Sequence, residues 1–365
     1  MPYSNIDKPS SYFNTKLYTG NGTVESNTQA ITGVGFSPDL VWIKMRSGTD
    51  GNILEDSVRG VGRYLISNST GSEGGGGTGL LDSFDSDGFT VNCDEGGNVF
   101  NTSTNGNGST YASWSWRGSD SSAVSNTSGT ISSTVSANTT SGFSIVSYTG
   151  TGANATVGHG LGVAPKMIIV KRRDSTANWF VYHASIGNNG YLMLNSTDAK
   201  DQPNSTVWNN TSPTSSLFSL GTSSGINASG GTYIAYCFAE VKGFNKFGSY
   251  IGNGSANGTF VYTGFKPAFI LIKRDVSATN WLMYDNKRDS FNVMYKLFQP
   301  NTNSAEATAD PTVTNIDFLS NGFKLPTTWS GINGSGSTYY YMCFAESPFT
   351  SSKGIPTTAR WSGLS

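Results

Sequence analysis

Short apolar runs alternate along this chain with turns rich in glycine, serine and asparagine. Residues 167–170 (Met-Ile-Ile-Val) and 269–272 (Phe-Ile-Leu-Ile) are continuous apolar runs, which are typical of strands buried on both faces or of a sandwich core. The dipeptides Asp87-Gly88 and Asn321-Gly322 are strong signals for hairpin turns. No stretch keeps a helical period over three turns. The pattern therefore predicts an all-β protein built from short strands.

The same order of signals occurs three times. Two copies open at residues 147–152 and 249–254 with Ser-Tyr-x-Gly-x-Gly, and each continues with an apolar run, an Asn-Trp step and a closing aromatic strand. A more diverged copy opens at residues 17–22 and lacks both the Asn-Trp step and the closing Phe-Ala-Glu. A period near one hundred residues suits a whole domain rather than a solenoid unit. We therefore expect three tandem β-sandwich domains, jelly-roll-like, strung in a row.

The segments between the repeats suggest domain boundaries. We expect a leader at 1–16, repeat 1 at 17–118, a Ser/Thr-rich joint at 119–141, repeat 2 at 142–241, repeat 3 at 242–347 and a tail at 348–365. Pro2 and Pro9 argue against regular structure in the leader. The polar composition of the joint favours a flexible connection. The link at 242–247 is short, so repeats 2 and 3 should lie close together.

The amino-acid composition of the chain argues against several classes of function. Charged residues make up 13% of the chain and the net charge is -1, which leaves no electrostatic footprint for nucleic acid. The apolar runs are too short for a membrane span, and the first residues carry no secretory signal. Cys237 and Cys343 hold matching places in two repeats, so we expect buried strand residues and no disulfide framework. These features predict synthesis in a reducing cytoplasm.

Candidate catalytic and metal-binding chemistry is sparse. The two histidines, His159 and His183, have no neighbours at metal-ligand spacing, so a structural or surface role is expected and no metal or cofactor is predicted. Residues 82–88 resemble an oxygen-rich calcium loop but lack its spacing, which favours a plain turn. Basic residues such as Arg59 and Arg288 are expected to pair with the nearby carboxylates Asp56 and Asp285.

Aromatic residues are the best candidates for recognition. Trp179 and Trp281 match across repeats and are expected in the core. Four unmatched aromatics lie in the variable stretches between strands: Trp208, Trp329, Trp361 and Tyr191. Exposed rings in such loops suit glycan or protein binding because a rigid ring covers area at little entropic cost. These four residues are therefore candidate surface-recognition residues, with packing inside the loops as the alternative.

The combined motif is Tyr-x-Gly-x-Gly, Gly-x-x-Pro followed by apolar residues and Lys, Asn-Trp, Asn/Asp-Gly-Phe, and Gly-x-Thr-Tyr ending in Phe-Ala-Glu. This motif resembles tandem repeat domains of bacteriophage virion proteins, frequent in phages of marine bacteria and cyanobacteria. The opening residues 8–22 are also similar to the start of such proteins. The resemblance implies a virion location after synthesis in the host cytoplasm, other virion proteins as partners, and a homo-oligomer, with a trimer favoured. It supplies no catalytic residues.

Three functions are compatible with these features. The first is a non-enzymatic tail-fibre or head-fibre-like protein that displays β-domains for attachment to a host surface glycan or protein. The second is a capsid decoration or cement protein. The third is a carbohydrate-binding or glycan-degrading protein, which for hydrolysis would need two carboxylates about 5–10 Å apart. The acids shared between repeats, Glu240 and Glu346, do not form an evident pair.

Overall fold

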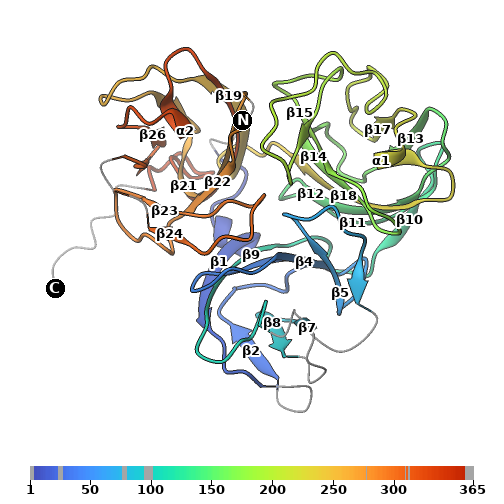
Figure 1. Ribbon diagram of the computed structural model, residues 1–365, viewed down its shortest axis with the longest axis horizontal. Helices are drawn as coiled ribbons and strands as arrows, with labels where there is room; N and C mark the ends of the chain where they lie inside the picture. The colour runs from blue at the N-terminus through green and yellow to red at the C-terminus, as the bar shows by residue number, and fades with distance from the viewer. Residues whose placement is uncertain are drawn as a thin grey trace.

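The computed structural model describes residues 4–23, 28–75, 80–93, 102–276, 278–308, 310 and 313–357. These residues are mostly in strands, and the described helices are single turns: η1 (Pro9–Ser11), α1 (Ser224–Asn227) and α2 (Ser330–Asn333). The all-β prediction is confirmed. Figure 1 shows the strands gathered in three lobes around a common centre, with repeat 1 running from blue to teal, repeat 2 in green and yellow, and repeat 3 in orange and red.

Each lobe has one large antiparallel sheet. In repeat 1 the order is β1 (Phe13–Thr19), β9 (Thr110–Trp116), β3 (Leu40–Met45), β4 (Asn52–Asp56), β5 (Arg63–Ile66) and β6 (Gly74–Gly75). In repeat 2 it is β10 (Val124–Asn126), β11 (Ser133–Asn138), β12 (Phe143–Thr149), β18 (Thr232–Ala239), β14 (Pro165–Arg172), β15 (Trp179–His183) and β16 (Leu192–Met193). In repeat 3 it is β19 (Asn245–Ile251), β27 (Thr338–Pro348), β21 (Phe265–Arg274) and β22 (Trp281–Asp285).

A smaller sheet covers one face of each large sheet. Repeat 1 has β2 (Gln29–Thr32), β8 (Gly88–Asn92) and β7 (Leu80–Asp85). Repeat 2 has β13 (Ala155–Gly158) and β17 (Leu217–Leu220). Repeat 3 has β20 (Phe260–Tyr262), β26 (Gly322–Lys324) and β25 (Asp317–Leu319), with a separate pair β23 (Lys296–Leu297) and β24 (Ala307–Thr308). Each lobe is thus sandwich-like, and the two predicted hairpin turns join β7 to β8 and β25 to β26.

Two expectations about the connecting segments are wrong. The stretch 119–141, expected to be a joint, contributes β10 and β11, and β11 pairs with β12 over all six of its residues. The leader is not irregular throughout, because η1 forms at Pro9 and β1 starts at Phe13. Ile6 of the leader is 4% exposed and belongs to the central core. Polar strands and a proline-started turn are recognisable only once their packing partners are known.

The three lobes are not strung in a row as the sequence suggested. The second face of every large sheet points inward, and together these faces form one apolar cluster that draws residues from all three repeats. At its centre lie three rings in equivalent positions, Trp116, Phe238 and Phe344. Their centroids are 6.2, 6.1 and 5.8 Å apart, which makes a nearly equilateral triangle. The triangle marks a pseudo-threefold axis within one chain.

This arrangement explains the continuous apolar runs. The run 167–170 in β14 alternates between two clusters, because Met167 and Ile169 belong to the central core, whereas Ile168 and Val170 pack inside lobe 2. In β21, Phe269 and Leu271 face the centre while Ile270 and Ile272 face the interior of lobe 3. A strand buried on both faces needs apolar residues at every position, as the sequence pattern predicted.

A lysine follows each of these two runs and also the equivalent run 40–43 in β3, and its amine reaches into the neighbouring lobe. Each Nζ donates a hydrogen bond of 3.0 Å to a carbonyl oxygen there: Lys44 to Asn303, Lys171 to Thr70, and Lys273 to Thr197. Burial lowers the pKa of each of these ammonium groups to about 8. The contacts run from lobe 1 to 3, from 2 to 1 and from 3 to 2, which is the cyclic order of a threefold ring.

The Asn-Trp step makes the same cyclic contacts. The indole Nε1 of Trp179 donates to Ile66 O in lobe 1, and that of Trp281 donates to Met193 O in lobe 2. Repeat 1 has Asn52 in this position, and its Nδ2 donates to Thr302 O in lobe 3 at 2.7 Å. The divergence of repeat 1 therefore preserves the contact between lobes with a different donor. Trp179 and Trp281 are buried in these interfaces.

Buried charges and thiols lie where the sequence suggested. Asp56 pairs with Arg59 at 2.5 Å and Asp285 with Arg288 at 2.6 Å, and all four side chains are buried. Cys237 and Cys343 are buried free cysteines in β18 and β27. The predictions of local carboxylate pairing and of buried strand thiols are confirmed.

Candidate binding grooves

Exposed aromatic side chains concentrate on repeat 3. Among the described residues, the aromatics classed as exposed are Phe260, Tyr262, Phe291 and Phe349, and none lies in repeats 1 or 2. Phe260 and Tyr262 point outward from β20, because the residue between them, Val261, faces the lobe interior. Alternation along a strand puts every second side chain on one face. Among the described residues, lobe 3 therefore carries exposed aromatic rings that the other lobes lack.

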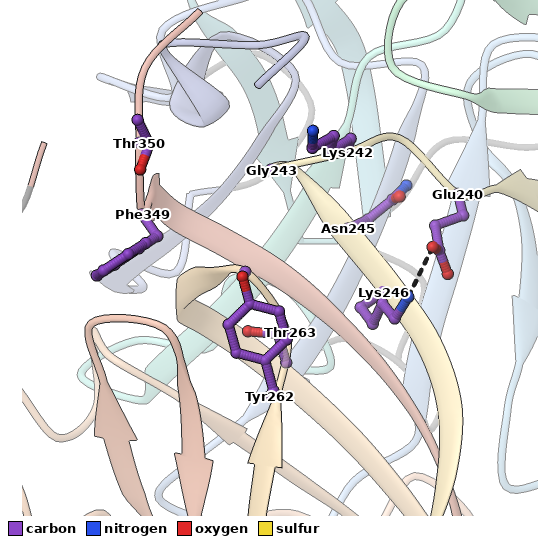
Figure 2. A pocket seen from close by; sticks show the side chains of 10 residues that line it. Glu240, Lys242, Gly243, Asn245, Lys246, Tyr262, Thr263, Phe349 and Thr350 are labelled. Atoms are coloured by element: carbon purple, nitrogen blue, oxygen red, sulfur yellow. Dashed lines mark hydrogen bonds and ion pairs between the residues drawn. The ribbon is translucent and has the colours of Figure 1, made fainter. Parts of the chain in front are cut away.

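A groove of about 300 Å³ opens beside Tyr262. It lies between the start of β19, the end of β20 and the segment after β27, and its lining residues are Glu240, Lys242, Gly243, Asn245, Lys246, Tyr262, Thr263, Gly264, Phe349 and Thr350. Figure 2 shows Tyr262 and Phe349 apart from the ion pair in which Lys246 Nζ lies 2.8 Å from Glu240. The groove thus has aromatic and charged parts, a mixture that suits a polypeptide ligand.

Lobe 1 has a groove in the corresponding place. A cavity of about 310 Å³ is lined by Asn14, Thr15, Lys16, Leu17, Gly33 and Lys287. Strand β1 is the counterpart of β19, and Gly33 follows β2 as Thr263 follows β20. Both grooves therefore lie between the edge strand of the large sheet and the edge strand of the small sheet.

Lobe 2 has a hairpin in that position. Strand β11 pairs with β12, the counterpart of the edge strands β1 and β19, and Ser133 Oγ donates to Gly158 O at the end of β13. A Cβ placed on Gly160 would meet side-chain atoms of Val135 and Ala137 at 3.1 and 3.2 Å. Gly160 thus leaves room for β11, and Gly158 leaves room for Asn126 of β10. The hairpin closes the side of the sandwich that stays open in lobes 1 and 3.

A smaller cavity of about 200 Å³ lies beside α2. Its lining includes Arg274, Asn280, Gln299 and the half-buried Trp329. In lobe 2 the equivalent arginine, Arg172, forms an ion pair with Asp174 at 3.0 Å. Lobe 3 has Val276 at the position of Asp174, and Arg274 donates instead to Ser337 Oγ at 2.8 Å.

The structure separates the four predicted recognition residues. Trp208 is 2% exposed and Tyr191 is 8% exposed, so the expectation that these two rings face solvent is wrong. Both pack inside lobe 2, where Trp208 contacts Tyr182 and Tyr191 contacts Phe180. Trp329 borders the cavity beside α2. Trp361 lies outside the described residues.

Among the described residues, no three His, Cys, Asp or Glu side chains lie close enough to hold a metal ion. His159 and His183 are buried and bond to backbone carbonyl oxygens. Glu346 pairs with Lys266 at 2.8 Å, as Glu240 does with Lys246, so each shared acid has its own lysine partner.

Sequence reasoning missed the grooves although two signals were present. Phe260-Val261-Tyr262 alternates with aromatics on its outer face, which indicates an unusually apolar edge. Residues 130–135 alternate before repeat 2 and have no counterpart before repeat 3, whose link at 242–247 is short. The second signal indicates a strand that one repeat has and the next lacks.

Residues 8–348 match a family described as a domain of unknown function, DUF7483. The chain belongs to the DUF7483 family. The match spans all three lobes, so the family domain is the whole ring of repeats rather than one sandwich. No curated protein and no solved structure matches the chain. Within the described residues of this DUF7483 domain, no helix has the length and apolar character needed to cross a membrane.

Proposed function

We propose that this protein is a non-enzymatic structural component of a bacteriophage virion, tail-fibre or head-fibre-like, which displays jelly-roll-like domains for attachment to a host surface. The observation that supports the proposal best is the shared apolar core, which joins three sandwiches into one block. A block of this kind suits a building unit of an extracellular particle because it exposes many loops on a rigid support. The resemblance of its repeats to phage virion domains supports the same assignment.

Analysis of purified particles tests this proposal. Mass spectrometry of virions should detect the protein at a fixed copy number, and a gold-labelled antibody should mark fibres. Soluble protein should also compete with particles for binding to host cells. Absence of the protein from purified particles would overturn the assignment.

The proposed oligomer is a homotrimer. Because the three lobes of one chain already close the central core, such a trimer would assemble through outer surfaces. Sedimentation analysis should then give three times the mass of the chain. A monomer over the whole range of concentrations would contradict this part of the proposal.

A capsid decoration protein is the second candidate. The pseudo-threefold axis favours it, because a ring of three similar lobes in one chain can dock on a threefold-symmetric position of a shell. Electron microscopy with a tagged copy separates the two candidates: label on the head supports decoration, and label on the tail supports a fibre.

Carbohydrate binding is the third candidate. The cavity beside α2 favours it, because an indole, a guanidinium and amide side chains line one small hollow. Screening against host envelope glycans should show binding that is lost in Trp329→Ala and kept in Trp208→Phe. Release of reducing sugar would indicate a glycan-degrading enzyme instead.

A further inference from the structure

We propose that the grooves of lobes 1 and 3 each receive an extended strand from a partner protein, which adds to the free edge of β1 or β19 as β11 adds to β12. This inference goes beyond the virion assignment and does not depend on it. It rests on a comparison within one molecule, since the same position is filled in lobe 2 and open in the other two lobes.

The register of β19 shows that backbone N–H and C=O groups on its outer edge have no strand partner among the described residues. Gly252 N donates to Ser337 O, and Ala345 N donates to Phe244 O. The even-numbered residues of β19 therefore bond to β27, and the N–H and C=O groups of Phe247, Ser249 and Ile251 point away from it. Of these groups, Ile251 O accepts a hydrogen bond from Thr259 Oγ1. No described strand other than β27 pairs with β19. A free edge of this kind is a template for strand addition.

Lobe 2 shows how these positions are used. Ile145 and Ser147 of β12 correspond to Phe247 and Ser249 of β19. They lie opposite Ser136 and Thr134 of β11 in the paired register. The added strand in lobe 2 is therefore antiparallel to the edge strand and aligned residue by residue. We assign the same geometry to the strand that lobe 3 receives.

The edge of β1 in lobe 1 follows the same rule. Gly20 N donates to Ser109 O, so the backbone groups of Thr15, Leu17 and Thr19 point away from β9. Side chains meet some of these groups, because Thr15 N donates to Asn14 Oδ1 and Gln29 Nε2 donates to Thr19 O. Such local bonds are exchangeable for strand pairing at small net cost.

The chemistry of the occupant follows from β11. The segment Ser133–Asn138 is uncharged, and the side chains that face the small sheet, Val135 and Ala137, are small or β-branched. In lobe 3, Tyr262 holds the position of Gly158, and its exposed ring narrows the space in the groove. The backbone hydrogen bonds of β19 therefore supply the binding. The partner segment is therefore a short extended stretch without charges, in which small and β-branched residues alternate with polar ones.

The source of this strand is a different protein rather than a second copy. Within the described chain, the segment of this type is β11, and all six of its residues already pair with β12. A second copy could supply it only by giving up that pairing. A partner with a free extended segment pays no such cost.

A synthetic peptide with the sequence of residues 123–140 is the probe. Added to the full chain, it should bind at two sites and slow hydrogen exchange at the amides of Ser249 and Ile251 in lobe 3 and of Leu17 in lobe 1. A scrambled peptide is the control. Tyr262→Gly copies the residue found at Gly158 in lobe 2 and should tighten binding at lobe 3 by about tenfold. Tyr262 is exposed, so the fold should tolerate the change.

Thr32→Trp is the matched blocking variant, because exposed Thr32 in lobe 1 corresponds to Gly158. It should abolish binding at lobe 1 and leave lobe 3 unchanged. Absence of peptide binding at both edges, in the wild type and in Tyr262→Gly, would overturn the proposal. Self-association of the chain that protects Ser249 without any peptide would assign the groove to a second copy and would overturn the choice of partner.

Discussion

Asp56, His183 and Asp285 hold one equivalent position, the last residue of the strand that flanks the central run, and each contacts the next lobe. Asp56 accepts a hydrogen bond from Tyr236 Oη, and Asp285 accepts one from Trp114 Nε1. His183 Nε2 lies 3.1 Å from a carbonyl oxygen in lobe 3, and its Nδ1 accepts from Ser185 N. This pair of bonds requires the neutral ring, because a second ring proton would face the Ser185 N–H. Burial therefore lowers the pKa of His183 to about 4.

The first prediction concerns acid stability. Because the folded pKa of His183 lies below its usual 6.5, the unfolded chain binds a proton between pH 6.5 and 4 that the folded chain does not. Its contribution to stability is therefore lost as the pH falls through this window. His183→Gln should reduce the loss in free energy of unfolding between pH 7 and pH 4.5 by about 2 kcal/mol. Denaturant titrations at pH 7 and pH 4.5 measure this reduction. A reduction of the same size in His159→Gln would contradict the assignment to His183.

The single-turn helices α1 and α2 are each held by the buried asparagine at their end. In lobe 3, Asn333 Nδ2 donates to Thr327 O at 2.7 Å and its Oδ1 accepts from Asn253 N. In lobe 2, Asn227 makes the equivalent bonds to Gly221 O and Thr151 N. A tyrosine adds a second clamp, since Tyr339 Oη donates to Ser330 O. An element too short to be stable alone is thus fixed by side chains around it.

The second prediction tests this clamp. Asn333→Asp would place a buried carboxylate against the carbonyl oxygens that Nδ2 now serves. We expect the free energy of unfolding to fall by about 3 kcal/mol, because a donor is lost and a charge is left without a partner. Chemical denaturation at pH 7 measures the loss. Asn257→Asp, at an exposed position in the same lobe, is the control and should change stability by less than about 0.5 kcal/mol.

The strands that the sequence predicted are those whose apolar pattern is complete in itself, such as residues 167–170 and 269–272. Strand β11 was interpreted as a joint because Ser133–Asn138 is mostly polar. Gly160 leaves space for it although this glycine lies more than twenty residues away, and Gly158 leaves space for Asn126 of the neighbouring β10. The Ser-Gly-Ile-Asn turns of α1 and α2 are identical, so a residue-by-residue comparison of the repeats could have found them.

At the scale of the whole molecule, the ring closes through three ion pairs in equivalent places. Arg46 pairs with Glu306 and Arg173 with Glu73, whereas the third pair has its charges exchanged, Lys200 with Asp275. The sequence showed three repeats but not this ring. An apolar run indicates that both faces of a strand are buried, but it does not indicate what covers the second face.

The third prediction uses the exchanged pair. Lys200→Glu alone puts two carboxylates together, and we expect it to lower the free energy of unfolding by about 1–2 kcal/mol. The double variant Lys200→Glu/Asp275→Arg copies the other two interfaces and should recover most of that loss. Denaturant unfolding at low salt measures both values. Additive losses in the double variant would show that this pair does not couple the lobes.

The fourth prediction is that the three lobes unfold as one unit. Trp116 contacts Phe238 in lobe 2 and Phe344 in lobe 3. Trp116→Ala should therefore lower stability by about 3–5 kcal/mol and shift hydrogen exchange in all three lobes together. Calorimetry of the wild type should give a single transition. Trp329→Ala, at the periphery, is the control, and a variant Trp116→Ala that loosens only lobe 1 would contradict the shared core.

The backbone N–H and hydroxyl of Ser352 bond to the carboxylate of Asp7 at 2.7 and 2.5 Å. The strands of lobe 3 therefore end beside the segment that leads into lobe 1. The two ends of the described chain thus lie close together in the ring of repeats. A circularly permuted gene could join residue 357 to residue 4 by a short linker and open the chain between the exposed Ser121 and Ser122. Such a permutant would read repeat 2, repeat 3, repeat 1 and still form the same three interfaces, so the order of the repeats along the chain is separable from the architecture they build.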